Sequence, residues 1–361
     1  MLKKIDRYIM GKFMVTFFVI IGMIILLASV FDFSEKLDAF VGKGEQGPSL
    51  RAILLEYYLN FALFFANMFA PFFAFIAVIF FTSRMAARLE IISILGSGAS
   101  YSRLLRPFIV TACFIALLNW LSANFVIPKA NEVKMNFEQK YFGRMNFSMM
   151  NVHRQYSDSE FVYVKSFNFQ IKSGGAFAYE KFVDGQLKTK IMSHTVLYDT
   201  INNRWKLMDY LIRDLNGVKE KMRSGSQMDT IFPFTPEIFR HETKKIITMS
   251  NEELDDFIEQ EKLHGSKYLN IYMLEKHQRH ANPFTIIVMT LLAVPIASRK
   301  VRGGIGIHLA IGVTLAFTYI YLSKVFTASA STGGIDPFWA LWIPNLLFFA
   351  TSLGLIKYAQ K

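Results

Sequence analysis

The stretch SRMAARLEIISILGSGASYSRLLRP, residues 83–107, lies between two apolar runs that are each long enough to span a membrane. It contains four arginines, and basic residues concentrate in short loops on the cytoplasmic side. Good helix formers over residues 84–95 give an apolar face, and Gly96 and Gly98 suit the end of a helix. The pattern predicts a short cytoplasmic helix, which either docks a soluble motor or lies on the membrane surface.

Composition limits the class of protein. Hydrophobic residues make up 52% of the 361 residues, and the mean hydropathy is +0.29, which is too apolar for an ordinary soluble domain. The net charge of +12 is spread along the chain and forms no nucleic-acid-reading motif. We therefore expect membrane lipid, and no nucleic acid, as the partner for this charge. The single cysteine, Cys113, gives no disulfide framework and no metal cluster, and we expect no metal or other cofactor.

Three apolar runs occur in the first third of the chain. Residues 13–31 carry no charge and lack the small-residue cleavage site of a signal peptide, so we expect a retained first span. Residues 54–81 and 108–127 are the predicted second and third spans, the latter closed by Pro128. Residues 1–127 therefore form three predicted transmembrane helices, with the cytoplasmic helix at about residues 84–98.

Residues 128–281 are polar and contain no run long enough to span a membrane. Between residues 161 and 172, side chains alternate with the period of a strand. Three residue pairs suit tight hairpin turns: Asp184-Gly185, Asn202-Asn203 and Asn216-Gly217. Seven or more short strands of this kind predict an antiparallel β sandwich or open barrel. A capping box at Ser250 and Glu253 predicts that helices follow the sheet.

Three further spans are predicted at residues 284–297, 305–322 and 338–356, so residues 282–361 form a second transmembrane unit. Short flanks on the side of the 83–107 loop are rich in basic residues, whereas the opposite flanks carry few: Lys36, Lys43, Arg51 and Lys324. This bias predicts cytoplasmic N- and C-termini and an external β-domain. The expected fold class is a membrane protein of six transmembrane helices with an inserted antiparallel β-domain.

Four segments carry a resemblance to a known family: IDRYI at residues 5–9, EIISILGSGAS at 90–100, PFTIIVMTLLAVPIASRKVRGG at 283–304 and WIPNLLF at 342–348. Together they resemble the LptF/LptG permeases of the lipopolysaccharide export ABC transporter of Gram-negative bacteria. No single segment is specific, but their order and spacing cover the whole chain. The resemblance implies that lipopolysaccharide is extracted from the inner membrane and passed to a periplasmic bridge.

The resemblance also implies partners. These are a second LptF/LptG-like subunit in a heterodimer, an LptB-like ATPase dimer, and LptC-like and LptA-like periplasmic proteins. The β-domain is similar to the family's periplasmic jellyroll. This chain has no G-x-x-x-x-G-K-[ST] phosphate-binding loop, so we expect ATP hydrolysis in a partner and no catalytic residue here.

Glu90 matches the acidic position of the family's coupling helix, which pairs with basic groups of the ATPase. The resemblance therefore implies an ATPase-coupling site made of Arg88, Glu90, Gly96, Ser97 and Gly98. We expect the two glycines to set the backbone shape rather than to act chemically. The alternative interpretation of Glu90 is a solvated helix carboxylate.

The first and fifth spans line the substrate cavity and gate in this family. The residues expected there are Phe17, Ile20, Ile24, Leu27, Lys36, Thr314 and Lys324. The first four share one helix face suited to acyl chains, and the two lysines end their spans where lipid A phosphates would arrive. Alternatively, the lysines extend to ordinary headgroups. Asp32 stands where some family members carry a basic residue, and this weakens a cationic first-span site.

A function of another class is a motor-coupled membrane anchor that presents its β-domain for protein interaction without lipid passage. A membrane enzyme is disfavoured, because the sequence shows no acid/base or metal constellation. We expect His308, inside the fifth span, to be hydrogen-bonded within the bundle rather than to relay protons. His277 and His280 are expected at the surface.

Overall fold

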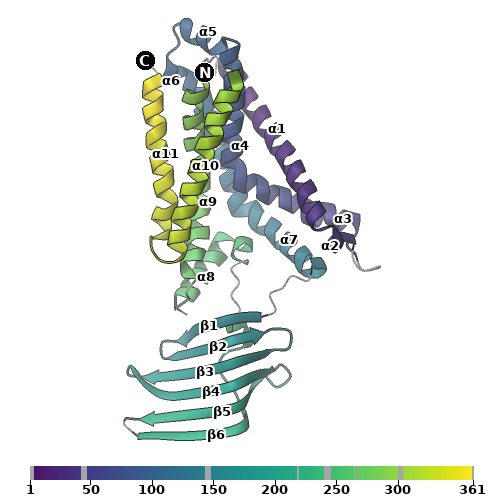
Figure 1. Ribbon diagram of the computed structural model, residues 1–361, viewed down its shortest axis with the longest axis vertical. Coiled ribbons are helices and arrows are strands. Elements are labelled where there is room, and N and C mark those ends of the chain that lie inside the picture. Colours follow the sequence, from purple (N-terminus) through teal and green to yellow (C-terminus); the bar gives the residue numbers. More distant parts are fainter. Residues whose placement is uncertain are drawn as a thin grey trace. The chain divides into compact units, whose positions relative to one another are not determined.

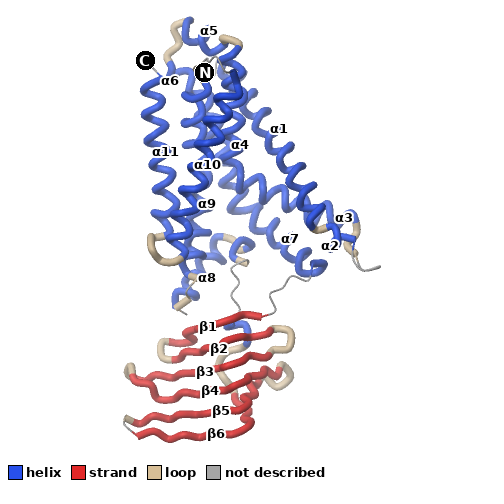
Figure 2. The backbone as a smooth tube through the Cα atoms, viewed as in Figure 1, coloured by secondary structure: helices blue, strands red, loops and turns tan. Residues whose placement is uncertain are grey.

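A computed structural model describes residues 4–41, 47–142, 148–217, 219–239, 245–263, 265–266, 268–299 and 304–359. The chain forms two compact units (Figure 1). The helical unit comprises Met1–Gly143, Lys245–Asn251 and Asn270–Lys361, and the β-domain comprises Arg144–Lys244 and Glu252–Leu269. Figure 2 shows that the first unit is built from helices and the second mainly from strands. The predicted basic residues Lys3, Lys43, Lys300, Arg302 and Lys361 lie outside the described residues.

Six helices among the described residues are long and apolar enough to cross a membrane, which confirms the six predicted spans in order. The first is α1 (Lys4–Glu35), followed by the short α2 (Leu37–Val41). The second joins α3 (Leu50–Ala52), the π-helix η1 (Ile53–Tyr58) and α4 (Leu59–Ala87). The last three are α9 (Leu269–Ala297), α10 (Gly304–Ser331) and α11 (Pro337–Ala359).

The third span does not end at Pro128, in contrast to the prediction. It joins α6 (Tyr101–Leu121), the π-helix η2 (Ser122–Val126) and α7 (Ile127–Phe142) in one continuous rod. Pro128 lies inside this continuous helix, directly after the π-helical segment, where the regular pattern of backbone hydrogen bonds is already interrupted and a missing N–H is tolerated. The helix therefore continues well beyond the apolar run.

The short helix α5 (Glu90–Gly96) joins the second span to the third. Figure 1 places the start of α1 and the end of α11 at the end of the helical unit that also carries α5. We call this the α5 end, and we call the opposite end of the helical unit the far end. Two spans separate α5 from the start of α1, and four separate it from the end of α11. Both numbers are even, so both ends lie on the same side of the membrane as α5.

Burial differs strongly between the spans. In the fourth span, 72% of the apolar stretch is buried within the chain, whereas only 11% of the first and 17% of the fifth are buried. Helices do not gain hydrophobic energy by associating within lipid, so close packing and polar contacts must hold them. The fourth span is thus the centre of the helical unit, and the first and fifth present open surfaces.

A buried hydrogen-bonded trio fastens the last three spans together. Thr285 of α9 lies 3.1 Å from the Tyr319 hydroxyl of α10 and donates to Asn345 of α11 at 2.9 Å. Tyr319 donates to the same Asn345 oxygen at 3.0 Å. All three side chains are less than 9% exposed. Polar side chains that bond across helices in this way hold transmembrane bundles.

The described part of the β-domain forms one antiparallel sheet of six strands in the order β1 to β6. The strands are β1 (Ser148–Ser157), β2 (Glu160–Asn168), β3 (Ser173–Val183), β4 (Gln186–Asp199), β5 (Arg204–Asn216) and β6 (Lys219–Thr230). The inserted antiparallel β-domain is confirmed, whereas the expectation of seven or more short strands is corrected. The strands are fewer and longer, and the hydrophobic face is covered by the segment after β6 rather than by a second sheet.

Aromatic side chains fill the core of the β-domain. Trp205 is fully buried and donates from its indole nitrogen to the backbone carbonyl of Phe234 at 3.0 Å. Phe232 and Phe234 follow β6 and stack at 5.1 Å between ring centroids. Phe239, in the short 3-10 helix η3 (Pro236–Phe239), completes the cluster. Large buried aromatic residues thus compensate for the missing second sheet.

The three predicted hairpin turns are present among the described residues. Asp184 and Gly185 both have positive φ, 53° and 73°, as a primed two-residue turn between β3 and β4 requires. Asn203 (φ 50°) and Gly217 (φ 62°) occupy the same conformational region after β4 and β5. In the second hairpin, hydrogen bonds from the Asn202 side chain and from the backbone N–H of Ile201 lower the pKa of the Asp199 carboxyl.

A line of left-handed residues crosses the sheet. Asn151, Ala176 and Asp209 have φ of 52°, 51° and 50° and lie beside the row of paired residues Val152, Val164, Phe177, Ser193 and Tyr210. At this line the alternation of buried residues shifts by one position. In β2 the buried residues are even-numbered up to Val164, and the next buried residue is Phe167. Simple alternation along residues 161–172 therefore did not predict which side chains are buried, because the burial pattern of β2 shifts where it pairs with strands that carry the left-handed residues Asn151 and Ala176.

We predict that Gly174→Val destabilises the β-domain. A Cβ at this position would lie 2.8 Å from both Phe167 and Val164 and 3.1 Å from Val196, and the added branches would overfill the core. The loss of stability is expected to be about 1 to 3 kcal/mol. Amide hydrogen exchange in β2–β4 of the full-length chain in detergent measures it.

The matched control is Gly175→Ala. Its Cβ would meet only the Ser166 hydroxyl, at 3.3 Å, so exchange in the same strands should change little. Equal exchange rates in Gly174→Val and the unmodified chain would contradict the close packing described here.

Candidate functional site

The loop between the second and third spans is divided by one strained residue. Leu89 adopts the left-handed conformation (φ 64°, ψ 9°) between α4 and α5. For a residue with a side chain this costs about 1 to 2 kcal/mol. The predicted single helix over residues 84–95 is therefore two helices, because α4 continues to Ala87 and α5 begins at Glu90.

The residues expected to couple to an ATPase lie together at the α5 end. Arg88, Gly96, Ser97 and Gly98 are exposed, and Glu90 is half-buried in the first turn of α5. Gly98 has φ +86°, so its role is conformational, as the sequence indicated. The Ser97 hydroxyl donates to the Ile94 carbonyl at 2.8 Å and closes the helix.

The predicted apolar face of this segment is split. Met85 and Ile91 are buried in the helical unit, whereas Leu89 and Ile92 are 46% and 53% exposed. Sequence periodicity could not separate these pairs, because the break at Leu89 rotates α5 relative to α4. Leu89 and Ile92 therefore join the candidate docking surface, which is apolar at its centre and flanked by Arg88 and Glu90.

Two contacts connect the start of α1 to this loop. The Tyr8 hydroxyl donates to Glu90 Oε2 at 3.0 Å, and Arg103, just after the loop, donates to the buried Asp6 at 2.6 Å. Asp6 and Tyr8 belong to the IDRYI segment, but nothing in the sequence showed which residues they face, 82 or more positions away.

The first span carries its expected acyl-chain residues on two different surfaces. Phe17 is buried, and Ile20 and Ile24 pack against the core of the helical unit. Only Leu27, of the four, is exposed (54%). The open surface of α1 contains other apolar side chains: Val15, Phe18, Val19, Met23, Leu26 and Val30.

The fifth span presents an open face that includes Thr314 and Lys324, both exposed. Phe317 and Tyr321, between them, are 65% and 72% exposed. The Thr314 hydroxyl donates to the Ala310 carbonyl at 3.0 Å, which satisfies it within the helix. No ion pair joins Lys324 to any residue that the structure describes, so its ammonium group is open to an anionic partner.

The opposite face of α10 packs tightly inside the helical unit. A Cβ on Gly312 would lie 2.2 Å from the end of Ile79 of α4, which shows how closely the two helices approach. His308, one turn earlier, is 4% exposed. The hydrogen bond expected for its ring is not present among the described residues.

Lys36 differs from Lys324 because its charge is already compensated. Its ammonium group lies 2.5 Å from Asp32 and also donates to the Tyr57 hydroxyl. Tyr57 and Tyr58 both donate to Asp32, at 2.9 and 3.4 Å. The Lys36 and Asp32 side chains are only 16% and 14% exposed. Asp32, which the sequence marked as a departure, thus neutralises the lysine expected to meet phosphate.

A second lysine completes this cluster at the far end. Lys134 of α7 lies 5.4 to 5.8 Å from the ring centroids of Tyr57, Phe61 and Phe64 and 3.7 Å from Glu138. Cation–π contacts of this kind stabilise partly buried cations. Together with Phe40, Phe137 and Phe142, these residues fasten the end of α1 to the second and third spans. We call this set the far-end cluster.

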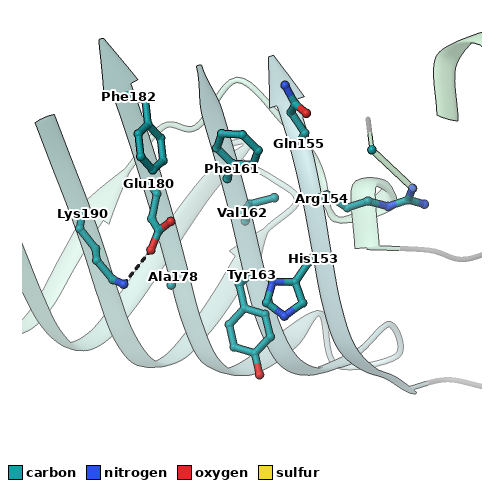
Figure 3. A pocket seen from close by; sticks show the side chains of 11 residues that line it. His153, Arg154, Gln155, Phe161, Val162, Tyr163, Ala178, Glu180, Phe182 and Lys190 are labelled. Carbon is teal, nitrogen blue, oxygen red and sulfur yellow. Dashed lines mark ion pairs between the residues drawn. The ribbon is translucent and has the colours of Figure 1, made fainter. Parts of the chain in front are cut away.

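The β-domain has a groove of about 490 Å³ on the face opposite its aromatic core (Figure 3). Phe161 and Phe182 meet edge to face at 5.5 Å, and the His153 and Tyr163 rings lie 4.2 Å apart. Glu180 pairs with Lys190 at 2.7 Å, so these two charges cancel. Arg154, which also lines the groove, is paired with Glu261 at 2.6 Å, and these two ion pairs make the groove a poor site for phosphate groups.

Arg279, between the two histidines of α9, was missed by the sequence analysis. It is 5% exposed and donates to the Asn251 side chain at 2.9 Å and to the Ile246 carbonyl at 3.2 Å. These bonds hold the returning chain, η4 (Ile246–Thr248), against the helical unit. His280 is exposed, as expected, and His277 is half-buried, 5.6 Å from the Phe338 ring.

The architecture and the site define a class of protein. Six membrane-crossing helices with two incompletely packed spans, a short helix with an exposed apolar centre at one end, and an inserted β-domain are features of a transporter membrane subunit. The model of the family "Lipopolysaccharide export system permease LptF/LptG" matches residues 7–358. The chain belongs to the LptF/LptG family of lipopolysaccharide export permeases, and it is not an enzyme.

Individual relatives agree over the full length. The chain is 21% identical over 355 residues to the lipopolysaccharide export system permease protein LptG of Escherichia coli strain K12, covering 98% of this chain and 97% of that protein. The same values hold for LptG of Escherichia coli O6:H1. The match supports a multi-pass protein of the inner membrane.

We predict that Lys324 reacts with an amine-modifying reagent about tenfold or more faster than Lys36, because Lys36 must first break charged hydrogen bonds to become reactive. Mass spectrometry of the full-length chain in detergent measures both rates. Asp32→Asn should raise the rate at Lys36 and leave Lys324 unchanged.

The matched control is Asp38→Asn, which removes an exposed carboxylate two residues after Lys36. It should leave both rates unchanged. Similar rates at Lys36 and Lys324 in the unmodified chain would contradict the far-end cluster.

Proposed function

We propose that this chain extracts lipopolysaccharide from the inner membrane, as one permease subunit of an ABC transporter, and passes it to a periplasmic bridge. Family membership supports lipopolysaccharide as the cargo. The observation that carries the rest of the proposal is the uneven burial of the spans, because only 11% of the first and 17% of the fifth are covered within the chain. Apolar helix faces that are this exposed within the chain are expected to be covered by another helix or by lipid.

The open faces of α1 and α10 form the gate and cavity lining in this proposal. Leu27 and its exposed neighbours on α1 meet acyl chains, and Thr314 lines the cavity from α10. Lys324 supplies the positive charge for lipid A phosphates, since charge-assisted hydrogen bonds to phosphate are strong. Lys36 instead holds the far end of α1, because Asp32 and Tyr57 already engage its ammonium group. Phe17, Ile20 and Ile24 support the gate from behind.

The α5 end is the proposed docking surface for an LptB-like ATPase dimer. Leu89 and Ile92 supply an exposed apolar centre, and Arg88 and Glu90 supply charges at its border. Gly96, Ser97 and Gly98 let the backbone turn close to the partner. Interfaces commonly combine a buried apolar anchor with a polar rim.

The remaining partners complete the proposed assembly. A second LptF/LptG-like subunit would cover the open faces of α1 and α10 and enclose the cavity in a heterodimer. The β-domain would continue into LptC-like and LptA-like proteins outside the membrane. In this arrangement the termini and α5 are cytoplasmic, and the β-domain is periplasmic.

Orientation is tested by cysteine labelling. In a Cys113→Ser background, Ile201→Cys should react with a membrane-impermeant maleimide in cells whose outer membrane is permeabilised, because Ile201 is 90% exposed in the β-domain. Ser97→Cys, exposed at the α5 end, should react only after the inner membrane is opened. Labelling of both positions from the same side would contradict the proposed topology.

Lipid passage is tested by photo-crosslinking in the assembled transporter. Photoreactive residues at Leu27 and Thr314 should capture lipopolysaccharide, because both positions lie on open faces of the gate spans. Leu353 of α11 is similarly exposed (49%) but lies outside the proposed cavity, and it should capture several-fold less.

Capture at Leu353 equal to that at Leu27 and Thr314 would show unspecific membrane contact. Absence of capture at both gate positions, in a complex that still binds its ATPase, would favour an anchor that presents the β-domain without lipid passage.

A further inference from the structure

The helix α5 is attached to its neighbours through two turns. Leu89 in the left-handed conformation precedes it, and Gly98, with φ +86°, follows it. Between these turns α5 has only the seven residues Glu90–Gly96. Ile91 of α5 is buried in the core of the helical unit, and the two turns leave the ends of α5 able to change their angle to α4 and α6 about that contact.

One side-chain hydrogen bond joins α5 to α1 within the described part of the chain. It is the bond from the Tyr8 hydroxyl to Glu90 Oε2, at 3.0 Å, and Glu90 is the first residue of α5. Oε1 of Glu90 accepts no hydrogen bond from a described residue, so the carboxylate can bond Tyr8 and a basic partner together. The same residue therefore belongs to the proposed docking surface and to the contact with α1.

The residues of α1 on both sides of Tyr8 are packed tightly in the helical unit. Asp6 is 3% exposed and accepts from Arg103 of α6 at 2.6 Å. Ile9 and Phe13 are fully buried, and Phe13 lies 5.8 Å from Phe81, which stacks on Phe108. The first four turns of α1 thus form a packed segment, whereas the rest of the helix is largely exposed up to the far-end cluster.

These contacts give a route from α5 to α1. A displacement of α5 pulls on Tyr8, while the Asp6–Arg103 pair, two residues earlier in α1, acts as the pivot. Beyond Phe17, α1 packs against the helical unit through one face only, with Ile20 and Ile24, so a small rotation at its start moves its open face. The route needs no movement of α4 or α6, whose contacts are more extensive.

We propose that Tyr8 is a positioning residue that transmits movement of α5 to α1, and hence couples the docked motor to the gate. The inference rests on the proposed function, since it assigns a task to the same docking surface. It adds a residue of the first span to the coupling machinery. Asp6 and Arg103 serve as the pivot of that movement.

Tyr8→Phe tests the inference in the full transporter reconstituted in lipid vesicles. The change removes one hydroxyl from an exposed ring (43%) and leaves the charge of Glu90 in place. The amount of bound ATPase and the rate of ATP hydrolysis should stay within about twofold of the unmodified complex. Lipopolysaccharide released per ATP hydrolysed should fall about threefold or more.

A spectroscopic measurement separates coupling from mere stability. A pair of spin labels on Val15 and Val110, both exposed in α1 and α6, should report a distance change when ATP is added to the unmodified complex. In Tyr8→Phe that change should shrink, although the starting distance stays the same. A structural role alone would alter the starting distance or the yield of folded complex instead.

Tyr358→Phe is the matched control. Tyr358 is an exposed tyrosine (63%) in α11, the span that ends at the α5 end, and its ring rather than its hydroxyl contacts Arg299. This variant should transport normally. Equal losses in Tyr8→Phe and Tyr358→Phe would overturn the inference.

Glu90→Gln provides the complementary variant. The amide oxygen still accepts from Tyr8, whereas the negative charge toward the motor is lost. Bound ATPase should fall, and the total release of lipopolysaccharide should fall with it.

Two further results would overturn the inference while the proposed function stands. One is unchanged transport per ATP in Tyr8→Phe. The other is loss of bound ATPase in Tyr8→Phe as large as in Glu90→Gln, which would mean that Tyr8 only orients Glu90 for docking. Failure of the unmodified complex to bind an ATPase or to release lipopolysaccharide would instead refute the proposed function.

Discussion

The first span is held at both of its ends, by apolar packing and an ion pair at one end and by polar contacts at the other. Apolar helices that associate within lipid gain no hydrophobic free energy, because lipid tails are as apolar as the side chains. A helix with an open face therefore needs close packing or polar contacts to hold its position. At the α5 end, the buried Asp6 of α1 pairs with Arg103, and three further residues, Ile9, Phe13 and Phe17, are buried. At the far end it has Asp32 and Lys36 bound to Tyr57 and Tyr58. The exposed stretch between these ends is free to face a partner or a lipid.

The two π-helical segments lie where irregular backbone is useful. In η1 the wider turn brings the consecutive residues Tyr57 and Tyr58 to one carboxylate, which a regular α-helix would not favour. In η2, Asn124 accepts from Asn251, which in turn bonds Arg279. Both segments thus coincide with polar networks that tie distant parts of the helical unit together. In both segments the irregular backbone positions side chains for these hydrogen bonds, and it does not turn the chain.

The β-domain combines a single sheet with an aromatic core. The line of left-handed residues through Asn151, Ala176 and Asp209 changes which alternate side chains face inward, so one continuous core forms on both sides of the line. Phe232, Phe234 and Phe239, after the last strand, cover that core. The opposite face keeps Phe161, Tyr163 and Phe182 exposed to the groove, where the Glu180–Lys190 pair balances the charge. This face is suited to uncharged ligands more than to phosphate.

The sequence alone determined the six spans, the inserted β-domain, the hairpin turns at Asp184-Gly185 and Asn202-Asn203, and the family, because hydrophobic length, turn chemistry and motif order are local properties. It also marked Glu90 and Asp32 as residues of interest.

Only the tertiary structure decided that Leu89 divides the 84–95 segment, that Pro128 lies inside a helix, and that Phe17, Ile20 and Ile24 face the core. Likewise, nothing local indicates that Lys36 is neutralised by Asp32 and Tyr57, or that Tyr8 reaches Glu90. These contacts depend on which helices are neighbours in the folded protein. The spacing of apolar residues predicts which face of a helix is apolar, but it does not identify the residues that this face contacts.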